Sequence, residues 1–139
     1  MNASTTVRAQ ASSDAQGYMP LIGRIAIAAI FVLSGLSKVT APVATIGYIR
    51  SAGLPVPELG FALAVIIELG GGLALIAGYR TRLVAGVLAI FSLATALAFH
   101  SQLGDQNQFI HFFKNVAMAG GLLQVVAFGA GHLSIDARR

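Results

Sequence analysis

Four long runs of apolar residues, separated by short polar segments, dominate the pattern of the chain. They cover residues 21–37, 59–78, 83–99 and 109–129. Each run is close to the ~20 residues that a helix needs to cross a hydrocarbon core about 30 Å thick. Because unsatisfied backbone groups exclude most other structures from lipid, the pattern predicts an all-α integral membrane protein, a four-helix bundle.

A shorter helix is predicted between the first two runs. Pro42 is a helix-start signal, whereas Gly53 and Pro55 are stop signals. Apolar residues recur between them at positions 43, 46 and 49. This punctuation is typical of a short interfacial helix, which we expect at the outer face of the membrane.

The first 18 residues are polar and rich in Ser, Thr and Ala, without apolar periodicity. We expect residues 1–18 to form a disordered cytoplasmic tail, residues 19–136 a transmembrane domain, and residues 137–139 a basic C-terminal end. A signal peptide would place its apolar region directly after a basic start and before a small-residue cleavage site. Here the apolar run starts late and ends in "SGLSK", so we expect the segment to be retained.

Composition supports a membrane protein and excludes several other classes. Only 10% of the 139 residues are charged, against roughly 25% in soluble domains. The absence of Cys excludes disulfides, thiol redox chemistry and thiolate metal sites, and three scattered His residues form no metal motif. The basic residues lie mainly at helix ends, so topology explains the net charge of +4 without a nucleic-acid partner.

The distribution of basic residues predicts the orientation. With four spans, one side of the membrane holds the tail, the turn after the second span and the C-terminus. That side carries Arg8, Arg24, Arg80, Arg82, Arg138 and Arg139, and the other side carries Lys38, Arg50 and Lys114. By the positive-inside bias, we expect both termini of this multi-pass protein in the cytoplasm.

One carboxylate, Glu68, lies near the middle of the second run and is soon followed by three glycines. Acids inside spans normally face the bundle or a wet cavity and pair with another group. Depth counted at ~1.5 Å per residue makes Arg24 and Lys114 the cations nearest to Glu68. We expect one of these two to be its partner, although both could instead extend outward to water.

The other polar residues of the spans complete a candidate buried network, a polar ladder from one face to the other. Its members are Glu68, Arg24, Lys114, Asn115, His100 and Lys38. Plainer interpretations stay open: an ion pair that only fixes helix register, Arg24 and Lys38 as interface anchors, and His100 as an interfacial cap. A second set, interpreted as helix-packing residues that allow close approach, comprises Gly70, Gly71, Gly72, Gly120 and Gly121.

Taken in order, several segments resemble the DoxX family of small four-helix bacterial inner-membrane proteins. They are "GRIAIAAIFVLSGLSK", "GLPVP", "IELGGGLALIAGYRTR", "AFH", "FFKN", "AMAGGLL" and "GAGHLSID". The resemblance covers about residues 20–136. One departure is that the closing segment of the family often reads Gly-Pro-Gly, whereas this chain has "GAG" at 129–131.

The resemblance implies association with redox processes at the membrane, since some members are linked to thiosulfate oxidation with quinone as acceptor and others to oxidative-stress and thiol detoxification. We therefore expect an accessory or subunit that binds a quinone or a partner oxidoreductase. In it, Glu68 would accept or relay protons, Arg24 or Lys114 would tune its charge, and His100 would lie at the outer mouth.

The sequence carries no haem, flavin or metal motif and no self-contained catalytic motif, so whether the protein is itself an enzyme stays open. One alternative is a small transporter, a proton or solute pathway, which in so narrow a bundle would require a homo-oligomer. A purely structural membrane scaffold is the third interpretation.

Overall fold

The computed structural model describes the backbone of residues 3–139 and the side chains of residues 17–139. Every regular element in this part is helical, which confirms the all-α prediction. The elements are α1 (Ala3–Thr40), α2 (Pro42–Ser51), α3 (Pro57–Val65), the π-helix η1 (Ile66–Gly70), α4 (Gly71–Ala77), α5 (Thr81–Phe99), α6 (Gln106–Phe128) and the 3-10 helix η2 (Asp136–Arg138).

Four helical segments in the described part are long and apolar enough to cross a membrane. They are Gly17–Thr40, Pro57–Ala77, Thr81–Phe99 and Gln106–Phe128. Each contains or closely matches one of the four apolar runs. The second consists of α3, η1 and α4 in direct succession, so the four-span prediction is confirmed.

The N-terminal segment differs from the expected disordered tail. Its backbone is helical from Ala3 and continues without a break into the first span. Lengthening an existing helix adds one hydrogen bond for each residue fixed and avoids the cost of a new nucleus, which explains how a polar segment can extend α1. Residues 1–2, and the side chains of residues 3–16, lie outside the described part.

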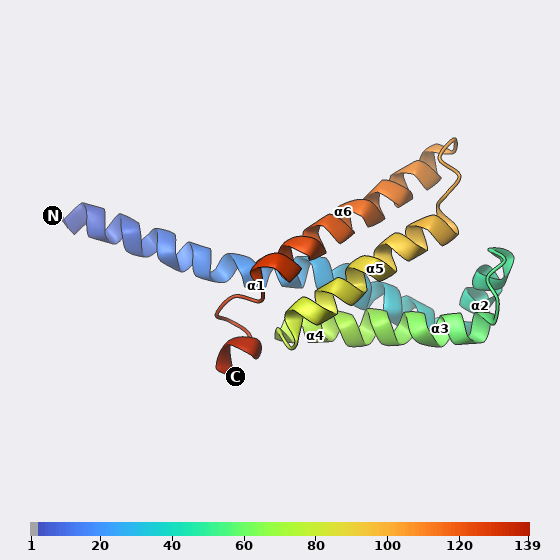
Figure 1. The fold of residues 1–139 in the computed structure, drawn as a ribbon, viewed down its shortest axis with the longest axis horizontal. Helices are drawn as coiled ribbons and strands as arrows, with labels where there is room; N and C mark the ends of the chain where they lie inside the picture. The colour runs from blue at the N-terminus through green and yellow to red at the C-terminus, as the bar shows by residue number, and fades with distance from the viewer. Residues whose placement is uncertain (1–2) are drawn as a thin grey trace.

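The four spans form two helix pairs that diverge (Figure 1). In one pair α1 packs along η1 and α4, and in the other α5 packs along α6. The pairs meet at the end that holds η2 and diverge toward α2 and the α5–α6 loop. These are called the η2 end and the α2 end below.

Small residues let α1 approach the second span closely. A methyl group at Gly72 would lie 2.8 Å from Val32 Cγ2 and 3.3 Å from the Val32 backbone nitrogen. Gly35 on α1 faces Leu69 in the same way. The absence of a side chain at these positions therefore brings the two backbones together.

The glycines that the sequence marked for packing divide into two groups. Gly71 lies 3.0 Å from Leu88 and Gly121 3.2 Å from Ile27, measured from a Cβ placed on each glycine. By contrast, a Cβ on Gly70 or Gly120 meets no atom of the described residues within 4 Å. Within the described part of the chain, Gly71, Gly72 and Gly121 face a neighbouring helix closely, whereas Gly70 and Gly120 do not.

The variant Gly72→Ala is expected to destabilise the protein by about 1–3 kcal/mol, because its methyl group overpacks the contact with Val32. Gly120→Ala is the matched control and should be neutral or slightly stabilising, since alanine is the better helix former. Unfolding of the purified variants in mixed micelles measures both. Equal stability of the two variants would contradict the packing assignment.

The short helix α2 is present as predicted, and it packs mainly against α3 at the α2 end (Figure 1). Ile49 is buried, and the Tyr48 ring stacks on Phe99 of α5 with 5.2 Å between centroids. An exposed ion pair, Arg50–Glu58 at 2.9 Å, ties α2 to the start of α3. The helix is thus held against both the second and the third span.

Candidate functional site

Glu68 lies in the π-helix η1, which interrupts the second span at Ile66–Gly70. π-Helical turns inside α-helices are rare and are often found at functional sites. Only 5% of Glu68 is exposed, so the carboxylate is inside the bundle rather than on its lipid-facing surface. The irregular turn therefore coincides with the one acid in the centre of a span.

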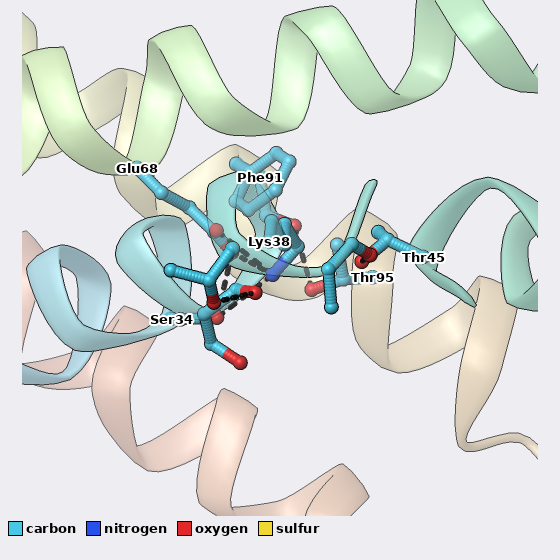
Figure 2. A network of polar contacts seen from close by, with 9 residues as sticks. Ser34, Lys38, Thr45, Glu68, Phe91 and Thr95 are labelled. Atoms are coloured by element: carbon cyan, nitrogen blue, oxygen red, sulfur yellow. Dashed lines mark hydrogen bonds and ion pairs between the residues drawn. The ribbon is translucent and has the colours of Figure 1, made fainter. Parts of the chain in front are cut away.

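The partner of Glu68 is Lys38 of α1. Lys38 Nζ lies 2.8 Å from Glu68 Oε2 and 3.1 Å from Oε1. Lys38 also donates a hydrogen bond to Ser34 Oγ at 2.8 Å, and Ser34 Oγ donates to Glu68 Oε1 at 3.2 Å. Figure 2 shows this closed triangle of contacts, with Phe91 and Thr95 of α5 and Thr45 of α2 nearby.

The expectation that Arg24 or Lys114 pairs with Glu68 is wrong, and side-chain direction is the reason. Helical side chains tilt toward the N-terminus of their own helix. In α1 this tilt carries Lys38 inward from the α2 end and carries Arg24 away from Glu68. In α6, which runs the opposite way, it carries Lys114 outward.

Arg24 instead binds backbone carbonyl groups at the η2 end, where it is 1% exposed. Its Nη1 donates to Leu75 O at 2.8 Å and to Ile76 O at 3.0 Å, and its Nη2 donates to Leu133 O at 2.6 Å. Two of these carbonyls lie in the last turn of α4, where helices have unsatisfied acceptors and a negative dipole end. Arg24 thus joins α1, α4 and the C-terminal segment.

Asp136 links the C-terminal segment to the start of α5 at the η2 end. Its two carboxylate oxygens accept hydrogen bonds from the backbone amides of Arg80 and Thr81, each at 2.8 Å, and so cap the start of α5. The hydrogen bond from the Thr81 amide, with that from Arg80, holds the pKa of the Asp136 carboxyl below its usual range. The C-terminal segment is thereby fixed across the α4–α5 turn.

An apolar layer separates the η2 end from the Lys38–Glu68 pair. Its central members are at most 4% exposed, and they come from α1, α4, α5 and α6. They are Ala28, Phe31, Leu75, Leu88 and Leu122. The polar residues therefore form two clusters, and the expected continuous ladder from one face to the other is not present in the described part of the chain.

The Lys38–Glu68 pair lines a cavity of about 970 Å³ between the diverging helix pairs. This volume is within the range of small-molecule sites, which are mainly apolar with a few polar groups. Most of the lining is apolar, and α2 contributes Thr45, Tyr48 and Ile49. The arrangement can hold an apolar molecule whose polar group faces the ion pair.

Three further candidates, His100, Lys114 and Asn115, also line this cavity. His100 stacks on His111 with 5.0 Å between ring centroids. Lys114 Nζ lies 3.0 Å from His111 Nδ1, and Asn115 Nδ2 donates to the His111 carbonyl at 2.9 Å. Five of the six sequence candidates thus surround one cavity, and only Arg24 lies apart from it.

Some residues of the site were not selected from the sequence. Ser34 belongs to a segment that resembles the DoxX family, and its spacing of four residues from Lys38 on one helix face could have linked the two. Thr45 and Tyr48 carried no such signal, because their position depends on how α2 folds over the bundle. In the described residues, no group of three or more His, Cys, Asp or Glu side chains is arranged to hold a metal ion.

Four apolar spans around a cavity with a buried ion pair define a small helical integral membrane protein. The sequence model of the DoxX family matches residues 19–101, and the chain belongs to this family.

Two curated relatives from Escherichia coli are similar over most of their length. The inner membrane protein YqjF is 36% identical over 116 residues, which is 84% of this chain and 88% of the relative. The inner membrane protein YphA is 34% identical over 123 residues, which is 85% of this chain and 88% of the relative. No solved structure matches the chain significantly.

Proposed function

We propose that the protein serves a redox system of the bacterial inner membrane by binding a quinone in the cavity at the α2 end. The observation that carries the proposal is the Lys38–Glu68 ion pair inside a mainly apolar cavity of about 970 Å³. The DoxX resemblance supports the redox association, and the names of the two relatives support the inner membrane. By the positive-inside bias, the arginine-rich η2 end would face the cytoplasm.

The polar groups of the cavity suit a quinone, which has two carbonyl acceptors on an apolar body. Lys38, Lys114 and Asn115 carry hydrogen-bond donors at the cavity wall. Glu68 offers carboxylate oxygens that can accept hydrogen bonds, and Lys38 is paired with them. A bound quinone would supply the electron-accepting chemistry, and a partner oxidoreductase would deliver the electrons.

The apolar layer at Phe31, Leu75, Leu88 and Leu122 favours binding over transport. A proton or polar solute that reached Glu68 from the α2 end would meet fully packed side chains before the η2 end. The cavity therefore suits a binding site that is open on one side, and it does not form a pathway through a single bundle.

The test is a titration of the purified protein with a short-tailed ubiquinone in mild detergent, with the shift in melting temperature as readout. Saturable stabilisation of the wild type is expected. Glu68→Gln should weaken binding by about tenfold, because it removes one charged hydrogen-bonding group. The control is Arg50→Gln/Glu58→Gln, which removes an exposed ion pair outside the cavity and should leave binding unchanged.

A further inference from the structure

A second concave surface lies at the η2 end, apart from the quinone cavity. It is a shallow groove of about 700 Å³ between the start of α5 and the C-terminal segment. Three arginines line it, together with two apolar side chains at the membrane-spanning helices. The lining residues used below are Arg80, Arg82, Arg139, Leu83 and Phe128.

Each of the three arginines is positioned by a specific local feature. Arg80 has a left-handed backbone, with φ 43°, and its amide is bound by Asp136. Arg82 lies against the end of α6, with Nε 3.4 Å from a Cβ placed on Gly129. The Arg139 guanidinium lies over the Tyr79 ring at 4.9 Å from its centroid. The groove is therefore formed by the start of α5 and the C-terminal segment, which the hydrogen bonds of Asp136 hold together.

The charge of the groove is not balanced by the described residues. Among the described residues, Asp136 is the only acidic side chain in the lining, and both its oxygens accept hydrogen bonds from backbone amides. The ion pairs of the described part, Lys38–Glu68 and Arg50–Glu58, involve none of the three arginines. An anion is the complementary ligand, and the planar guanidinium group suits phosphate oxygens in particular.

The apolar side of the groove lies at the level where two spans end. Phe128 is the last residue of α6 and is 80% exposed, and Leu83, in the first turn of α5, is 61% exposed. In a bilayer, such side chains would contact acyl chains, while the arginines beside them would lie at the depth of lipid head groups.

We propose that this groove binds an anionic phospholipid, with its phosphate held by Arg80, Arg82 and Arg139 and its acyl chains along Leu83 and Phe128. The ligand comes from the adjacent leaflet and fastens the C-terminal segment to the start of α5. This site is separate from the quinone cavity, and its occupancy does not depend on the proposed redox role.

The test compares phosphatidylglycerol with phosphatidylcholine, each added to the full-length protein in detergent, with the melting temperature as readout. Phosphatidylglycerol is expected to stabilise the wild type and phosphatidylcholine is not. In Arg80→Gln/Arg82→Gln/Arg139→Gln, the phosphatidylglycerol concentration for half-maximal stabilisation should rise roughly a hundredfold, since each arginine near an anionic lipid contributes roughly fivefold.

Arg138→Gln is the matched control, because Arg138 belongs to η2 but does not line the groove. It should respond as the wild type does. If the triple variant does not fold, the exposed single variant Arg139→Gln should still show a weakening of roughly fivefold. Equal stabilisation by the two lipids, an unchanged response of the arginine variants, or equal stabilisation by inorganic phosphate alone would overturn the proposal.

Discussion

Replacing Glu68 by leucine is expected to lower the free energy of unfolding by about 3 kcal/mol, because it leaves the Lys38 ammonium unpaired inside a span. The value is at the lower end for a broken buried pair, since the Lys38 side chain is 24% exposed whereas that of Glu68 is 7% exposed. The double variant Lys38→Met/Glu68→Leu should return to within about 1 kcal/mol of the wild type, because it removes both charges together.

A double-mutant cycle separates this pair from the alternative partner. Lys38→Met and Glu68→Leu should each cost about 3 kcal/mol and the double variant at most about 1 kcal/mol, so the coupling energy should be about 5 kcal/mol when unfolding is measured in mixed micelles. Lys114→Met, combined with Glu68→Leu, should be additive, because Lys114 contacts His111 and not the acid. Strict additivity for Lys38 and coupling for Lys114 would contradict the assigned pair.

Arg24→Leu is expected to cost about 3–5 kcal/mol, because it removes the charged donor from three carbonyl groups of α4 and the C-terminal segment. The effect should be local to the η2 end. Amide hydrogen exchange of residues 129–139 is expected to accelerate strongly, since Ile135 and Asp136 donate to Ala77 and Gly78 across the junction that Arg24 stabilises.

The control for this prediction is Arg24→Lys, which keeps the charge but cannot bind all three carbonyls with one planar group. It should recover only part of the stability. Quinone binding should be unchanged in both variants, because the apolar layer separates Arg24 from the cavity. Wild-type exchange rates in the C-terminal segment of Arg24→Leu would show that Arg24 does not hold it.

The spans and α2 could be predicted because their signals are local. Hydropathy and length define a membrane-crossing helix, and Pro42 and Gly53 mark α2 within two residues of its observed ends. The N-terminal segment was missed because its helix is an extension of α1 and not a product of its own apolar pattern. Nothing local in "IELGG" distinguishes a π-helical turn from an ordinary α-helical one.

Five of the six candidate residues line the cavity, but the pairing of Glu68 with Lys38 was not predicted. Counting depth along the axis placed Arg24 and Lys114 nearest to Glu68, but it ignored the tilt of side chains toward each helix's N-terminus. With that tilt included, Lys38 is the cation that reaches inward. The role of Arg24 depends on Leu133, which lies 109 residues away in an irregular segment, so no periodic pattern could reveal it.

The central claim is that the Lys38–Glu68 pair forms the polar part of a quinone site. It is tested most directly by the affinity of a short-tailed ubiquinone for Lys38→Met/Glu68→Leu, compared with Arg50→Gln/Glu58→Gln. The cavity variant, which should fold normally, is expected to bind at least about tenfold more weakly than the wild type, whereas the surface variant should bind equally well. Equal affinity of the two folded variants, or no saturable binding to the wild type, would contradict the claim.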